Sequence, residues 1–92
     1  MQIARVDILD LDKLETKHGV RSFEVRQVFW NAPHFRFAAR GNYQGENVYT
    51  AFGQTDGGRF LVVFFIYKLN RVALVISARD MESRERRLYE RK

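Results

Sequence analysis

The stretch FLVVFFIYKLNRVALVISA, residues 60–78, consists of two apolar runs separated by a short polar segment. Apolar runs without polar alternation are typical of central strands that are covered on both faces of a sheet. The stretch therefore predicts strands at residues 60–67 and 72–78. The sequence DGG at residues 56–58 is a hairpin signal, and it predicts a preceding strand at residues 48–54.

A fourth strand is expected at residues 34–40, followed by a polar loop at residues 41–47. In this strand His34 and Arg36 alternate with two phenylalanines. Successive side chains of a strand point to opposite faces of its sheet. The pattern therefore predicts a polar face that carries both His34 and Arg36, and an aromatic face toward the core.

Two short helices are expected before these strands. The first has an apolar stripe of Ile8, Leu11 and Leu14. It ends at Gly19, because glycine readily adopts the left-handed conformation found just past a helix end. The second begins with Ser22 as its N-cap and stops before Pro33, and its buried stripe consists of Val25, Val28 and Phe29.

A last helix is expected after Asp80, which can cap its start. Met81 and Leu88 are its predicted packing contacts, with Tyr89 beside them. The whole pattern predicts an α+β fold in which two N-terminal helices pack on a four-stranded antiparallel sheet that is followed by a C-terminal helix. The apolar stripe of the last helix is too thin to cover the second face of the sheet. We therefore expect a partner protein to cover this face in a hetero-oligomer.

Composition indicates one small globular domain, residues 1–92. Apolar residues make up 46% of the chain and include eight Phe, enough for a packed core. The chain has no cysteine, which excludes disulfide and thiolate chemistry. No stretch has the length of a membrane span, and the first ten residues lack the apolar run of a signal peptide. We therefore expect a soluble cytoplasmic protein.

The formal net charge is +5, and its excess lies in the C-terminal third. Residues 57–79 hold Arg59, Lys68, Arg71 and Arg79 and no carboxylate. Uncompensated positive charge on a small packed domain favours a polyanionic partner, and RNA is the leading candidate.

Three sequence blocks occur in a fixed order. These are KHGV at residues 17–20, GQTDGGRFLVVFF at residues 53–65 and ISARDMESRERRLY at residues 76–89. The ordered set resembles the BrnT-like toxins, over most of residues 14–89. The resemblance implies a RelE-type fold and a metal-independent endoribonuclease that inhibits translation. It also implies a DNA-binding, ribbon-helix-helix antitoxin similar to BrnA, so that any contact with DNA is indirect.

Metal-free cleavage of RNA needs a base for the ribose 2′-hydroxyl, an acid for the leaving 5′-oxygen and cations for the developing phosphorane charge. The chain lacks the acidic cluster of a magnesium nuclease, so we expect no metal or cofactor. His18 is the predicted acid or base, and Lys17 and Arg79 are predicted to hold phosphate in the same pocket. The alternatives are helix-end roles for Lys17 and His18, and an ion pair of Arg79 with Glu85 or Asp80.

The resemblance also makes Arg86 and Tyr89 catalytic or stacking candidates, because RelE-type nucleases place such side chains near the C-terminus. Glu85 shares a helix face with Tyr89 and is a candidate for binding RNA. The remaining RNA-binding candidates are Arg59, Arg36 and His34. The alternative for all of these residues is an ordinary solvated or packed surface.

Two other functions stay open at this point. One is a catalytically inactive relative that acts with its antitoxin in operon repression. Glu46 supports this alternative. Many BrnT-like toxins carry an arginine where the second strand begins, and this sequence has Glu46 just before the strand predicted at residues 48–54. The other is a basic RNA-binding module without catalytic activity.

Overall fold

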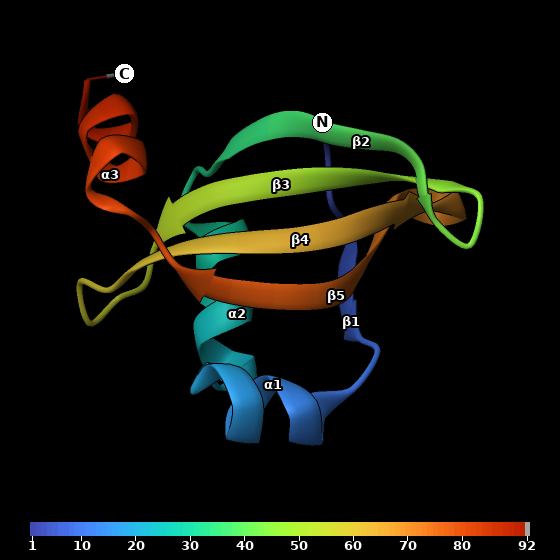
Figure 1. The fold of residues 1–92 in the computed structure, drawn as a ribbon, viewed down its shortest axis with the longest axis horizontal. Coiled ribbons are helices and arrows are strands. Elements are labelled where there is room, and N and C mark those ends of the chain that lie inside the picture. Colours follow the sequence, from blue (N-terminus) through green and yellow to red (C-terminus); the bar gives the residue numbers. More distant parts are fainter. Residues whose placement is uncertain (92) are drawn as a thin grey trace.

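The computed structural model describes residues 1–91 as a five-stranded mixed sheet with three helices (Figure 1). The elements are β1 (Arg5–Ile8), α1 (Leu11–His18), α2 (Ser22–Trp30), β2 (His34–Tyr43), β3 (Glu46–Gln54), β4 (Phe60–Lys68), a 3₁₀ turn (Leu69–Arg71), β5 (Val72–Asp80) and α3 (Ser83–Glu90). The strand order is β1-β5-β4-β3-β2. The α+β class is confirmed, whereas the prediction of four antiparallel strands is wrong.

The additional strand is β1, which pairs in parallel with β5 at the edge of the sheet. Its Val6 is buried, and Arg5 forms an ion pair with Asp7 on the exposed side. Ile8 also fits the helical spacing of the next segment, which is why periodicity assigned it to the first helix. That helix, α1, begins after Asp10, whose carboxylate accepts from the Lys13 amide at 3.0 Å.

Helices α1 and α2 cover one face of the sheet and lie below the strands in Figure 1. The predicted stripe of α2 is confirmed, since Val25, Val28 and Phe29 are all buried. Arg21 and not Ser22 occupies the N-cap position, and its amide donates to Glu24 at 3.0 Å. The predicted end of α1 at Gly19 is confirmed by its φ of 64°.

The hairpin between β2 and β3 is longer than predicted. Both strands continue through the expected polar loop and meet at a two-residue turn, Gln44-Gly45, with φ of 49° and 82°. Two successive residues with positive φ match the twist of a tight hairpin. Pairing between the strands therefore overrides the polar composition of this segment.

A β-bulge in β5 decides which face each of its last residues occupies. Phe65 pairs with Val75 and Phe64 pairs with Ser77, so Ile76 is an extra residue. An extra residue reverses the alternation of the strand beyond it. Ala78 therefore joins the core under the helices, and Arg79 projects from the opposite face.

This opposite face is covered at one end by α3, at the upper left in Figure 1. Tyr89 is the buried residue of α3, whereas Leu88 is half exposed, so the predicted packing through Leu88 is wrong; Met81 is half-buried. Glu82 and not Asp80 occupies the N-cap position. Strand residues Val48, Val62 and Ile66 are already buried on this face, which therefore gives no evidence for a covering partner.

Candidate functional site

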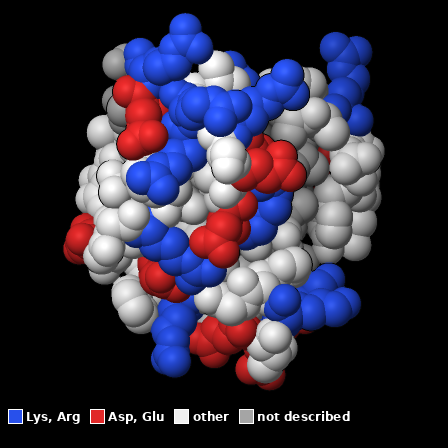
Figure 2. Space-filling model, turned by 60° about the vertical axis from the view of Figure 1, so that its left-hand side comes forward, with Lys and Arg blue, Asp and Glu red and all other residues white. Residues whose placement is uncertain are grey.

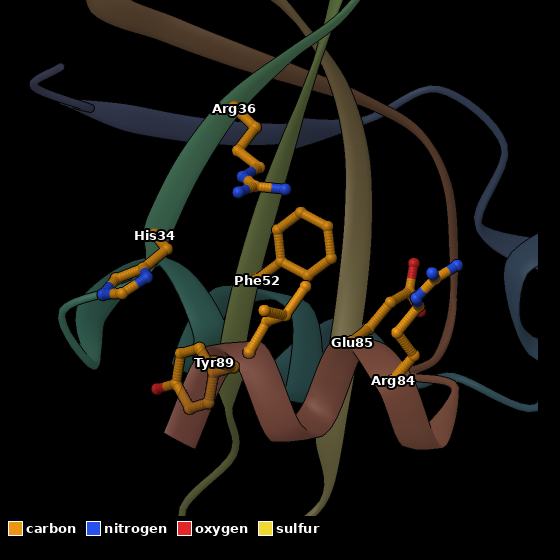
Figure 3. A pocket seen from close by; sticks show the side chains of 7 residues that line it. His34, Arg36, Phe52, Arg84, Glu85 and Tyr89 are labelled. Atoms are coloured by element: carbon orange, nitrogen blue, oxygen red, sulfur yellow. The ribbon is translucent and has the colours of Figure 1, made fainter. Parts of the chain in front are cut away.

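A cleft of about 470 Å³ lies between α3 and the sheet face that α1 and α2 do not cover (Figure 3). Its sheet side consists of His34, Arg36 and Phe52, and its helix side of Arg84, Glu85, Leu88 and Tyr89. In Figure 3 the side chains of Arg36 and Phe52 point from their strands into this space, and His34 lies beside Tyr89.

Strand register and helix periodicity bring these residues together. His34 pairs with Phe52, Phe52 with Val62 and Val62 with Arg79, so the four side chains form one row across the sheet. On α3, residues 84 and 88 and residues 85 and 89 are four apart and share one side of the helix. The predicted common face of His34 and Arg36 is confirmed, since both line the cleft.

Aromatic contacts hold α3 against the sheet. The ring of Tyr89 packs in a T-shaped arrangement against the rings of His34 and Phe60, with centroid distances of 5.4 and 6.0 Å. The half-buried ring of Phe52 also lines the cleft. The site therefore has an apolar, partly aromatic wall against which a flat group can pack.

Charges in and around the cleft are unequally compensated. Arg79 donates to both carboxylate oxygens of Glu85, at 2.7 and 2.9 Å. These hydrogen bonds lower the pKa of Glu85 and raise that of Arg79. Arg36 and Arg84, in contrast, form no ion pair with any of residues 1–91. Figure 2 shows Lys and Arg side chains gathered at this end of the molecule, toward α3, with acidic side chains among them.

The alternative considered for Arg79, an ion pair with Glu85 or Asp80, is thus confirmed for Glu85. Glu85 also accepts from the Glu82 amide at 2.8 Å, so it caps α3 as well. A carboxylate with a lowered pKa is ionised at neutral pH and cannot act as a general acid. Its role is to fix Arg79 and the first turn of α3 beside the cleft.

Arg86 lies outside the cleft. Its guanidinium stacks over Phe60, 4.1 Å from the ring centroid, and contacts Glu90 at 3.5 Å. It lies next to Glu85 on the helix, but it points to a different side. The structure therefore gives Arg86 a packing role on the flank of α3.

Lys17 and His18 lie on the other face of the sheet from Arg79. His18 is half-buried near Leu14 and Val75, which both belong to the core under the helices. Lys17 is exposed on the same helix. The expectation of one pocket that unites the His18 imidazole with the Arg79 guanidinium is therefore wrong, because the bulge in β5 directs Arg79 away from α1.

Arg59 is held in an ion-pair network and does not line the cleft. It donates to Asp80 at 2.7 and 3.2 Å, to Glu24 at 3.0 Å and to the Gly19 carbonyl at 2.9 Å. The hydrogen bond from Arg59 lowers the pKa of Asp80. The guanidinium thus connects the α1–α2 junction to the end of β5, and its charge is matched by two carboxylates.

Three cleft residues were not predicted from the sequence: Phe52, Arg84 and Leu88. The alternation in residues 48–54 placed Phe52 on the face of Val48 and Thr50, but only the pairing with β2 shows that this face also carries His34. Arg84 is four residues before Leu88, and this spacing indicates that the two side chains lie on the same side of the last helix. For Leu88 the sequence predicts a packing contact of the last helix and not a cleft position.

No three His, Asp or Glu side chains gather as a metal site within residues 1–91, and no helix in that range is long and apolar enough to cross a membrane. Residues 11–85 match a protein family described as the ribonuclease toxin, BrnT, of type II toxin-antitoxin systems. A search of curated proteins finds no match. The matched segment extends from the start of α1 to Glu85 and so contains the whole sheet side of the cleft.

Proposed function

We propose that this chain, which belongs to the BrnT family of ribonuclease toxins of type II toxin-antitoxin systems, cleaves RNA in the cleft between α3 and the β2–β3 hairpin. One observation carries the proposal. Arg36 and Arg84 form no ion pair with the described residues, and they line the same cleft as His34. Guanidinium groups bind phosphate oxygens in pairs, and imidazole transfers protons near neutral pH.

In the proposed reaction a ribose 2′-hydroxyl loses its proton and attacks the adjacent phosphorus, and the bond to the leaving 5′-oxygen breaks. His34 exchanges a proton with one of these two oxygens and water with the other, so the proton lost by the 2′-oxygen is balanced by the proton gained by the 5′-oxygen. Arg36 and Arg84 stabilise the negative charge that develops on the phosphorane. Tyr89 is a positioning residue, because its ring packs against that of His34. These side chains supply proton transfer and charge stabilisation, so the proposed reaction needs no metal ion.

The biological role follows from the family. A type II system pairs its toxin with a protein antitoxin, which we take to be a BrnA-like ribbon-helix-helix protein. Cleavage of RNA would inhibit translation, and the cytoplasm is then the compartment in which the toxin acts.

The position of Glu46 does not favour an inactive relative. Its carboxylate accepts from Lys68 at 2.6 Å, and it lines a groove with Arg5 and Leu74 that is separate from the cleft. The acidic residue that replaces the common arginine therefore leaves His34, Arg36 and Arg84 undisturbed. Catalysis in the cleft is compatible with this departure.

The two histidines of the chain provide a matched test. Purified toxin is incubated with total RNA, with and without EDTA, beside His34→Ala and His18→Ala. We expect His34→Ala to reduce the cleavage rate by about 10²–10⁴-fold, the usual contribution of one acid–base group. His18→Ala should cleave at the wild-type rate, and EDTA should have no effect. Full activity of His34→Ala, with circular dichroism showing a native fold, would remove the cleft as the active site.

A further inference from the structure

The outward side of α2 carries two exposed aromatic side chains. Phe23 and Trp30 are 55% and 57% exposed, although both belong to a helix that packs on the sheet. They are seven residues apart, so both lie on one side of the helix, about 10 Å apart along its axis. The buried stripe that contains Val25 and Val28 is on the opposite side. Large exposed rings in a row are typical of an interaction surface.

Positive charge separates the two rings. Arg26 is three residues after Phe23 and four before Trp30, which places it on the same side of α2. Its guanidinium donates to the carbonyls of Val6 and Ser22, and it forms no ion pair with any residue between 1 and 91. We call Phe23, Arg26 and Trp30 the α2 outer face.

No negative charge offsets Arg26 on this helix. The single carboxylate of α2, Glu24, accepts from Arg59 and from the Arg21 amide and is therefore turned toward the sheet end. Arg26 is therefore the charged residue of the α2 outer face, and its guanidinium is 3.2 Å from the Val6 carbonyl oxygen. An occupant of the α2 outer face must therefore offer apolar side chains together with negative charge.

We propose that the α2 outer face binds an amphipathic, acidic helix of the protein antitoxin. Apolar side chains seven residues apart on that helix would contact Phe23 and Trp30, and a carboxylate between them would pair with Arg26. A type II toxin requires a protein partner, and the net charge of +5 favours an acidic one. Trp and Arg are the residues that most often dominate the binding energy of such contacts.

Two other occupants fit the α2 outer face less well. A second copy of the chain would form a two-fold interface, which would bring Arg26 close to its own counterpart. Single-stranded RNA is bound along a positively charged groove, whereas this face carries one guanidinium. The α2 outer face and the RNA cleft also belong to opposite sides of the sheet. Antitoxin binding and RNA cleavage should therefore be separable by mutation.

The test is titration calorimetry of the antitoxin encoded together with the toxin, using full-length Trp30→Ala, Arg26→Glu and Leu69→Ala variants. Leu69 is 90% exposed at the turn between β4 and β5, and it serves as the matched apolar control. We expect Trp30→Ala and Arg26→Glu each to weaken antitoxin binding at least tenfold. Leu69→Ala should bind normally, and Trp30→Ala should cleave RNA at the wild-type rate.

Three results would overturn the proposal. The first is wild-type antitoxin affinity in both Trp30→Ala and Arg26→Glu. The second is weaker RNA binding by these two variants with unchanged antitoxin affinity, which would mean that the α2 outer face binds RNA. The third is a wild-type toxin that sediments as a homodimer and variants that sediment as monomers with unchanged antitoxin affinity, which would mean that the α2 outer face binds a second copy of the chain. Phe23→Gln is a second apolar variant in case Trp30→Ala does not fold, and it carries the same expectation of weaker binding.

Discussion

His34, the first residue of β2, and Tyr89, in the last turn of α3, meet edge to face with their ring planes inclined by 62°. Tyr89 is also the buried residue of α3. The contact therefore does two things, because it fixes the imidazole and it holds the helix against the sheet. The width of the cleft depends on this pair.

Tyr89→Ala should detach α3 from the sheet. Removing a buried aromatic side chain typically costs about 3 kcal/mol in the free energy of unfolding, and the α3 amides should lose protection from hydrogen exchange. Leu88→Ala is the control, since Leu88 is half exposed on the same turn and its loss should cost less than about 1 kcal/mol. Urea unfolding and exchange measurements check both values. Equal effects of the two substitutions would show that Tyr89 is not the anchor.

Arg36 and Arg84 should each bind one RNA phosphate. Arg36→Ala and Arg84→Ala should then weaken RNA binding, and each should reduce the slope of log affinity against log salt by about 0.7, the value for one phosphate contact on a single strand. The slope is measured by filter binding of a single-stranded RNA, with each arginine substitution made in the slowly cleaving His34→Ala protein. Lys17→Ala removes an equal charge from α1 and should leave the slope unchanged. An unaltered slope in both arginine variants would place the phosphate elsewhere.

The pairing of Glu85 with Arg79 should make stability depend on pH. Hydrogen bonds from Arg79 lower the pKa of Glu85 in the folded state. A lowered carboxyl pKa stabilises the fold above the unfolded pKa of about 4.3, and this contribution is lost as pH falls through the folded value. Glu85→Gln should therefore cost about 1 kcal/mol at neutral pH, and the difference should vanish in acid.

Urea unfolding of wild type and Glu85→Gln across this pH range is the measurement. The acidic partner of Arg59, Asp80, titrates in the same direction in both proteins, so its contribution cancels in the difference. Glu90→Gln is the control, because its contact with Arg86 is exposed and 3.5 Å long. A constant difference between wild type and Glu85→Gln at every pH would mean that the carboxylate charge is not involved.

The strands at residues 60–78 were predictable from sequence because their apolar runs fit no other buried element of that length. Strand β1 was not predictable from the sequence. Its four residues are too few to show a periodicity, and Ile8 fits the spacing of a helix equally well. The turn at Gln44-Gly45 was hidden by polar neighbours, because cross-strand pairing and not composition extends that hairpin.

Each half of the cleft was partly visible in the sequence. Strand alternation placed His34 with Arg36, and helix spacing placed Glu85 with Tyr89. Which helix face meets which strand face depends on tertiary packing, which no local pattern encodes. The error over His18 has a more specific cause, namely the extra residue Ile76, which reverses the direction of Arg79 relative to a regular strand.

Any side chain at Gly53, where α2 crosses β3, should lower the free energy of unfolding. A Cβ atom added there would lie 2.9 Å from Val28 Cγ1 and 3.3 Å from the Val28 carbonyl oxygen. Gly53→Ala should therefore push α2 outward and cost about 1–3 kcal/mol, the usual range for overpacking. At Gly57 an added Cβ meets nothing closer than 3.9 Å, so Gly57→Ala should be nearly neutral. Because the closest contact is with one methyl group of Val28, the combination of Gly53→Ala with Val28→Ala should cost less than the sum of the two single changes, although the contact with the carbonyl oxygen persists. Thermal unfolding of the four variants measures this coupling, and strict additivity would show that the two side chains do not compete for the same space.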